Sequence, residues 1–253
     1  MKNELKDIYE NFGTIEDIIG YDFQDCNLLT QAFTTKAYNK QYNKESLEFV
    51  GEASLRFYLN KMLVDTFGYI EDINEDGKMV FGLVEYDTKS KMTKLQNKLL
   101  HNSILGYRIE VLGLNKYLLM SKDEIKNFKN EELKEEANLF YSIFGAVVVD
   151  SEYNEDLIDE VLENLLNVDY YVVNNFNLEE PDYVTLVLNW NIKTNEEVPY
   201  YEFEDSEDGV KSQLIIQTND GDQIIEGVGY TAAGARRDCA KNVYLFLEKH
   251  DLL

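Results

Sequence analysis

The sequence predicts a mainly α-helical domain followed by a small domain of mixed helix and strand. Residues 43 to 65, 91 to 112 and 133 to 150 carry apolar side chains at spacings of three and four, the period of an amphipathic helix. Beyond Pro181, three short runs rich in β-forming residues are separated by turn signals and followed by a final helical pattern. The fold class that we expect is therefore helical first and α+β second.

The boundaries follow from where these patterns stop. We expect a helical domain over residues 1 to 165, a linker over 166 to 180 and an α-β-β-β-α domain over 181 to 253. Polar sequences at 70 to 78 and 121 to 132 predict connections between helices of the first domain. The elements of the second domain are expected at residues 182 to 190 (helix), 198 to 203, 213 to 218 and 223 to 228 (strands), and 232 to 249 (helix).

The composition indicates a folded chain, and the sequence shows neither a signal-peptide pattern nor a membrane-spanning run. At 253 residues, 44% of them apolar, the chain can bury a sizeable core. No apolar run approaches the roughly 20 residues that span a bilayer, and the charged start MKNELKD lacks signal-peptide character. We expect a cytoplasmic protein, and an organellar or viral-factory location stays open. Cys26 and Cys239 have no partner spacing, so neither a disulfide framework nor a zinc site is expected.

The net charge argues against a nucleic-acid partner. The chain has 48 acidic and 24 basic residues, a formal charge of −24. A surface of that sign repels polyanions, and nucleic-acid affinity normally depends on Lys and Arg that neutralise phosphates. The same acidity is equally compatible with a surface that only keeps the protein soluble.

Three glutamates in one helical segment are arranged as metal ligands would be. Residues 43 to 55 read NKESLEFVGEASL, in which Glu45, Glu48 and Glu52 are three and four positions apart. That spacing places all three carboxylates on one face of a helix. Carboxylate oxygens are the ligands that Mg²⁺ prefers, and bound Mg²⁺ can assist phosphodiester hydrolysis. A solvated acidic helix face is the alternative in so acidic a chain.

The same segment resembles the signature helix of the ribonuclease III family. Further resemblance lies in residues 19 to 38, IGYDFQDCNLLTQAFTTKAY, in the stretch from 105 to 119, and in residues 138 to 150, NLFYSIFGAVVVD. The resemblance implies a ribonuclease III-like helical domain in which Glu48 and Glu52 are metal-ligand positions, the second usually Asp, and Glu45 is an accessory acidic position. It also implies that Phe49 packs across a two-fold dimer, although an ordinary core position is compatible with the sequence.

Two further ligand positions depart from the family pattern. The resemblance implies an Asp and a Glu where this chain has Asn138 and Tyr141. Asn offers only a neutral carbonyl oxygen, and a phenol with an ordinary pKa of about 10 is neutral at pH 7. Glu135 and Glu136 lie just upstream, and only Glu135 shares the helical face of Asn138.

The second domain resembles a double-stranded-RNA-binding domain that has lost its phosphate contacts. Its α-β-β-β-α order and the sequence GVGYTAAGA at 227 to 235 carry this resemblance. The paired lysines that the family places at the start of the last helix correspond to Ala232 and Ala233, which leaves Arg236 and Arg237 as weak candidates for RNA contacts. The domain has 14 acidic and six basic residues, and its first inter-strand loop reads EDSEDG.

These departures favour a catalytically inactive ribonuclease III-like protein that acts as a structural or regulatory subunit of a protein or ribonucleoprotein complex. No cofactor is expected, and Mg²⁺ only if the protein is active. The partner is expected to be a protein, in a homodimer or heterodimer formed through the helical domain, with weak or absent RNA binding.

Two other functions stay open. One is a divergent Mg²⁺-dependent double-stranded-RNA endoribonuclease that uses Glu45, Glu48 and Glu52, with Asn138 or Glu135 as a further ligand. The other is a non-cutting protein that binds double-stranded RNA. The latter requires a basic patch assembled from scattered lysines, namely Lys36, Lys40, Lys89, Lys91 and Lys94.

Overall fold

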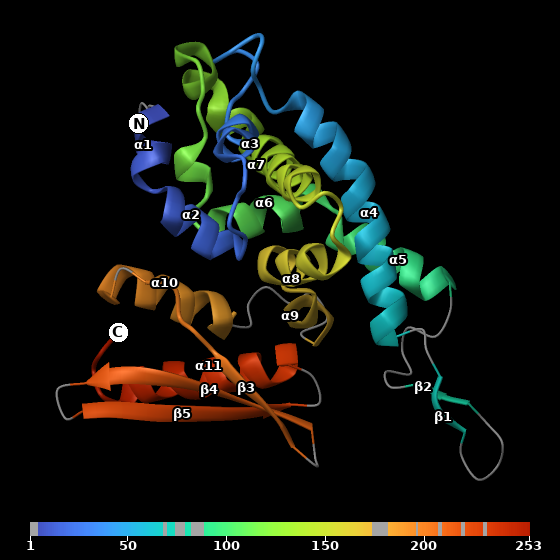
Figure 1. The fold of residues 1–253 in the computed structure, drawn as a ribbon, viewed down its shortest axis with the longest axis vertical. Helices are drawn as coiled ribbons and strands as arrows, with labels where there is room; N and C mark the ends of the chain where they lie inside the picture. The colour runs from blue at the N-terminus through green and yellow to red at the C-terminus, as the bar shows by residue number, and fades with distance from the viewer. Residues whose placement is uncertain are drawn as a thin grey trace. The chain divides into compact units, whose positions relative to one another are not determined.

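The computed structural model divides the chain into two compact units, Met1–Leu166 and Asn167–Leu253 (Figure 1). The structure describes residues 5–67, 70–73, 79–81, 89–173, 182–195, 197–206, 209–218, 221–229 and 232–253. The first unit is mainly helical, and the second contains a three-stranded antiparallel sheet with helices. The predicted fold class is thus confirmed. None of the helices in these described segments is long and apolar enough to cross a membrane.

The first unit is organised around two long helices, α4 (Glu45–Phe67) and α7 (Lys122–Asp150), which pack against each other (Figure 1). Its other elements are α1 (Leu5–Glu10), α2 (Phe12–Ile19), α3 (Cys26–Ala32), β1 (Ile70–Ile73), β2 (Met79–Phe81), α5 (Lys89–Leu99), α6 (Asn102–Val111), a 3-10 turn (Asn115–Tyr117) and α8 (Glu155–Leu166). The buried side of α7 presents Leu139, Phe140, Ile143, Phe144 and Val147, all fully buried. Burial of this apolar face is the main source of stability for such a helix.

Two glycines set the distance between α4 and α7. A Cβ atom on Gly51 would lie 1.8 Å from the backbone oxygen of Tyr141, and one on Gly145 would lie 2.1 Å from that of Leu47. Real Cβ atoms do not approach oxygen that closely, so both positions require glycine for the helices to pack at this distance. The crossing therefore brings the glutamate segment of α4 next to residues 135 to 145 of α7.

Helix α7 starts earlier than the sequence predicts. Residues 121 to 132 were expected to form a charged connection, but α7 begins at Lys122 and the expectation is wrong. The reason is a capping box: the Ser121 hydroxyl accepts a hydrogen bond from the Glu124 amide, and the Glu124 carboxylate accepts one from the Ser121 amide. This arrangement satisfies two amide groups at the helix start and outweighs the polar composition.

Part of the predicted polar connection at residues 70 to 78 is also wrong. The structure has an antiparallel pair of strands, β1 and β2, at this place, and residues 74 to 78 lie outside the described part of the chain. β-forming residues at 70, 73 and 79 to 81 flank a turn-prone Asn-Glu-Asp-Gly sequence, which is a pattern typical of a hairpin.

Asp150, the last residue of α7, fastens the segment that leads into α3. Its carboxylate accepts hydrogen bonds from the Tyr21 hydroxyl (3.0 Å) and from the backbone amides of Gln24 (2.7 Å) and Asp25 (2.9 Å). The side chain is buried, and three donors compensate for its desolvation. Asp150 is therefore a structural carboxylate and is fully engaged within the protein.

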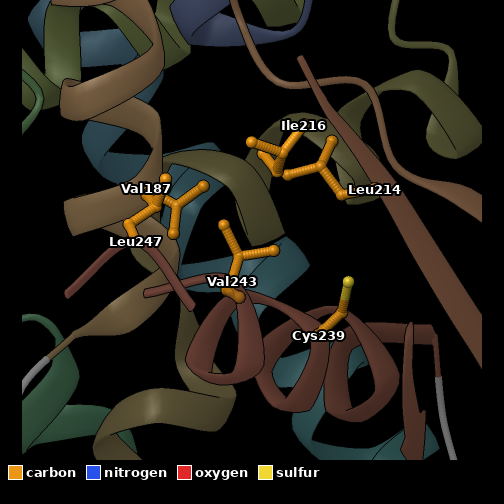
Figure 2. Packing of buried hydrophobic residues seen from close by; sticks show 7 residues of the cluster. Val187, Leu214, Ile216, Cys239, Val243 and Leu247 are labelled. Atoms are coloured by element: carbon orange, nitrogen blue, oxygen red, sulfur yellow. The ribbon is translucent and has the colours of Figure 1, made fainter. Parts of the chain in front are cut away.

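The second unit has the expected α-β-β-β-α order, formed by α10 (Tyr183–Asn195), β3 (Glu202–Ser206), β4 (Gly209–Thr218), β5 (Gly221–Gly229) and α11 (Ala232–Lys249). The strands pair in the order β3-β4-β5. Figure 2 shows the core between the helices and β4, where Val187, Leu214, Ile216, Cys239, Val243 and Leu247 converge. A Cβ on Gly227 would lie 2.0 Å from the Cys239 amide nitrogen, so glycine permits close packing of α11 on β5.

The segment expected to be a linker contains a further short helix, α9 (Val168–Val173), which precedes the undescribed residues 174 to 181. Val168, Tyr170 and Tyr171 in this helix are buried. Asn167, just before it, donates a hydrogen bond to the Asp182 carboxylate at 3.2 Å. Helical structure therefore continues beyond residue 166, and the apolar residues of α9 are buried.

Gly51→Ala is expected to lower the free energy of unfolding by about 1–3 kcal/mol or more, because the added methyl group forces α4 and α7 apart. Thermal unfolding followed by circular dichroism would measure the change. Gly13→Ala is the matched control: nothing lies within 4 Å of the position of its Cβ atom, and Ala favours the helix by up to about 1 kcal/mol. Equal stabilities of the two variants would contradict the packing argument.

The two cysteines are expected to react at very different rates. Burial raises the pKa of the Cys239 thiol to about 11, so it stays protonated and shielded at pH 8, whereas Cys26 is exposed. An aromatic disulfide reagent should therefore titrate one thiol rapidly and the second only after unfolding. Cys26→Ser should remove the fast phase. Two fast thiols in the native protein would contradict the packing of α11 on the sheet.

Candidate metal and RNA sites

The three predicted glutamates lie on α4, but each has a different environment. The carboxylate of Glu45 is exposed and forms an ion pair with Lys36 at 2.8 Å. Glu48 is partly buried and forms an ion pair with Lys44, one turn earlier. Glu52 is exposed, and its negative charge acts on the hydroxyl of Tyr141 across the helix crossing. Of the three, only Glu48 lies inside the junction of the two helices with a buried cation beside it.

Lys44 is a residue that the sequence reasoning missed. It directly precedes α4 and is 4% exposed, although lysine is almost never buried without a partner. Its backbone amide donates to the Thr34 oxygen at 2.8 Å, which fixes the start of the helix. Its ammonium group contacts the Glu48 carboxylate, and it lies 3.5 Å from a carboxylate oxygen of Glu135 on α7. The spacing of four between Lys44 and Glu48 was a signal available in the sequence.

Asn138 and Tyr141, at the two further predicted ligand positions, lie one turn apart on the adjacent stretch of α7 and are partly buried. Burial and the nearby Glu52 carboxylate raise the pKa of Tyr141 above its ordinary value, and Arg56 opposes the shift. A raised pKa keeps the phenol protonated at neutral pH. Tyr141 is therefore a neutral group where an anionic ligand would be needed.

Glu135 and Glu136 point to different surroundings. Glu135 reaches the Lys44 ammonium, whereas Glu136 is buried and accepts a hydrogen bond from the Asn115 side chain at 2.8 Å. Adjacent residues on a helix face directions about 100° apart, which accounts for the difference. Of the two, only Glu135 lies beside the glutamates of α4.

The residues at the junction do not fit a divalent metal ion. Mg²⁺ requires near-octahedral oxygen coordination with carboxylates that offset its charge. Here the carboxylates of Glu48 and Glu135 approach the same lysine ammonium, and the two other predicted ligand positions hold a neutral amide and a neutral phenol. Within the described residues, no group of three or more His, Cys, Asp or Glu side chains is arranged to hold a metal ion.

The basic residues predicted for RNA contact lie on α11 and are partly buried. The positive charge of Arg236 acts on the hydroxyl of Tyr201, and both Arg236 and Arg237 interact with other groups of the chain. Lys211 on β4 forms an ion pair with Glu226 on β5 at 2.5 Å. Ala232, at the start of α11, is exposed at a position where the resemblance predicts a lysine.

Comparison with known proteins finds bacterial ribonuclease 3 proteins as relatives. The chain is 27% identical over 202 residues to ribonuclease 3 of Roseburia hominis, covering 75% of this chain and 54% of the relative. It is 30% identical over 166 residues to ribonuclease 3 of Treponema succinifaciens, covering 63% and 42%. The chain thus spans about half the length of the curated relatives that it matches. No protein-family model matches it.

A solved structure extends this likeness to the fold. The nuclease domain of ribonuclease III from Campylobacter jejuni superposes with a TM-score of 0.50 and 25% identity, over 62% of this chain and 99% of that domain. The chain is therefore similar to ribonuclease III in sequence and, over its helical unit, in fold. In that Campylobacter nuclease domain, a region involved in dimer formation is structurally flexible.

This likeness does not bring the catalytic chemistry with it, because function depends on the site rather than on the fold. In this chain, the crossing of α4 and α7 places Glu48 at the junction of the two helices. Asn138 and Tyr141 stay substitutions at the predicted ligand positions. Phe49 is 78% exposed on α4 and so lies outside the core of this chain.

Proposed function

We propose that this protein is a non-cutting member of the ribonuclease III family that acts as a structural or regulatory subunit through protein contacts. The observation that carries the proposal is the α4–α7 junction, where an ammonium group lies between Glu48 and Glu135 and two neutral side chains face them. Metal-assisted hydrolysis needs carboxylates that hold the ion and a path for activated water. The junction offers a lysine and a phenol instead.

The second unit supports the same proposal. Duplex RNA is recognised largely through phosphates, and each phosphate contact contributes about one unit to the salt dependence of binding. Here Lys211 is neutralised by Glu226, and Glu202 and Glu204 are exposed on the neighbouring strand. A surface of this charge favours a basic protein over RNA as the partner.

A protein-contact surface is available on α4. Phe49 and Phe57 are 78% and 64% exposed, and they lie two turns apart on one face of the helix. Exposed aromatic side chains are enriched at protein interfaces, where their burial contributes much of the binding energy. We propose that this face forms the contact in a homodimer or in a heterodimer with a related chain.

The second candidate is a divergent Mg²⁺-dependent endoribonuclease. The curated relatives are named ribonuclease 3, and Glu48 and Glu52 lie on the helix where that activity would need them. The candidate requires a metal to displace Lys44 and to bind without carboxylates at positions 138 and 141. A cleavage assay separates the two candidates directly.

The purified protein is expected not to cut long double-stranded RNA in Mg²⁺ or Mn²⁺ at low salt, because the junction lacks a metal-holding carboxylate set. The wild type and Glu48→Gln should be indistinguishable on a denaturing gel. An active bacterial ribonuclease III in the same buffers serves as the positive control. Cutting that disappears in Glu48→Gln would overturn the proposal in favour of the nuclease.

The same samples test RNA binding on native gels. We expect no retardation of the duplex even at low salt, since Lys211, Arg236 and Arg237 of the second unit interact with other groups of the chain. Salt-sensitive retardation without cutting would instead favour the non-cutting RNA-binding alternative, with a slope of log affinity against log salt that counts the phosphate contacts.

Phe49→Asp is expected to weaken self-association by at least about tenfold, because a charge replaces an aromatic anchor at the contact. Sedimentation velocity over a range of concentrations would measure the dissociation constant. Tyr153→Asn is the matched control: Tyr153 is 62% exposed outside α4, and Asn tolerates its φ of 65°. A wild type that stays monomeric throughout would leave only the heterodimer.

A further inference from the structure

A buried lysine at the start of a helix is energetically unfavourable without compensation. The ammonium of Lys44 is desolvated, since its side chain is only 5% exposed. It also lies at the positive end of the α4 dipole, because the Lys44 carbonyl accepts the first helical hydrogen bond, from the Glu48 amide at 2.8 Å. The compensation must come from nearby negative charge.

That negative charge comes from both helices of the crossing. Glu48 on α4 and Glu135 on α7 have side chains that are 24% and 27% exposed, and both carboxylates approach the same ammonium nitrogen. Lysine has three donors on a flexible stem, so it can serve two carboxylates at once. The ammonium thus joins α4 to α7 electrostatically, beside the glycine contact that joins them sterically.

We propose that Lys44 is an internal cation that replaces a divalent metal ion at the α4–α7 junction. The reasoning is one of charge. Without a cation, Glu48 and Glu135 would place two negative charges in a partly buried junction, which is unfavourable. With neutral groups at 138 and 141, two carboxylates lie beside Lys44, and its ammonium group offsets half of their charge. A metal at Glu48 would have to expel Lys44 from its buried position.

The proposal deepens the proposed function by giving it a physical cause: the site is closed to metal by a residue of the chain itself. It also predicts that the folded state needs no metal. Any ligand that binds only the native state raises the apparent stability, so a metal-free junction should show no such response. Thermal stability and direct Mn²⁺ binding are therefore readouts that do not depend on RNA cleavage.

The experiment compares the full-length wild type with Lys44→Met after removal of metals by chelation. The wild-type melting temperature should be the same with and without millimolar Mn²⁺. Lys44→Met keeps the length of the stem but removes the charge, and its melting temperature should fall by about 5–10 °C. Mn²⁺ should restore part of that loss, and the affinity for Mn²⁺, measured by electron paramagnetic resonance, should rise at least about tenfold over wild type.

Two variants control for other causes. Lys44→Arg keeps the cation and should stay unresponsive to Mn²⁺. Lys36→Met removes an exposed lysine that pairs with Glu45, and it should change the melting temperature little because exposed ion pairs contribute little. If Lys44→Met does not fold, combining it with Glu48→Gln and Glu135→Gln should recover folded protein, since no unpaired charge then remains at the junction.

Three results would overturn the proposal. The first is Mn²⁺ stabilisation of the wild type that Glu48→Gln abolishes. The second is a Lys44→Met variant as stable and as unresponsive as Lys36→Met. The third is failure of the triple variant to recover a fold that Lys44→Met has lost. RNA cleavage by the wild type would overturn the proposed function, whereas the Lys44 proposal is judged on melting temperature and Mn²⁺ binding alone.

Discussion

The crossing of α4 and α7 at Gly51 and Gly145 is the constraint on which the rest of the first unit depends. At each glycine, a Cβ atom would lie about 2 Å from a backbone oxygen of the other helix, so the two backbones are in direct contact. Residues one turn away from the contact then necessarily lie beside the other helix. The positions of Glu48 and Tyr141 are consequences of this backbone contact and do not depend on their own chemistry.

Because of this independence, the helix crossing can form with other charges at the junction than those of a metal site. Clustered carboxylates repel one another, and a metal ion normally offsets that repulsion. Neutral groups at positions 138 and 141 reduce the repulsion without disturbing the glycine contact. Lys44 then supplies a positive charge from within the chain. The helix crossing itself depends on apolar burial and on backbone contact at the two glycines.

Sequence reasoning predicted the fold class because its evidence was periodic and extended. The closing helix was expected over 232 to 249 and is observed at Ala232–Lys249. It failed where a local hydrogen bond outweighs composition, as in the Ser121 and Glu124 capping box that starts α7. It also missed Lys44, because spacing reveals a pair with Glu48 but cannot reveal burial. That burial depends on contacts with Thr34 and with Glu135, far along the chain.

In both units, positive groups that lie in or near the candidate sites interact with acidic or polar groups of the same chain. Lys44 pairs with Glu48, Lys211 pairs with Glu226, and Arg236 acts on the buried Tyr201 hydroxyl. A phosphate ligand would have to displace these internal partners and also overcome the repulsion of a chain with a net charge of −24. A basic protein surface meets neither obstacle, because it can bind exposed carboxylates and leave the internal ion pairs intact. The electrostatics of the two units therefore favour the same kind of partner.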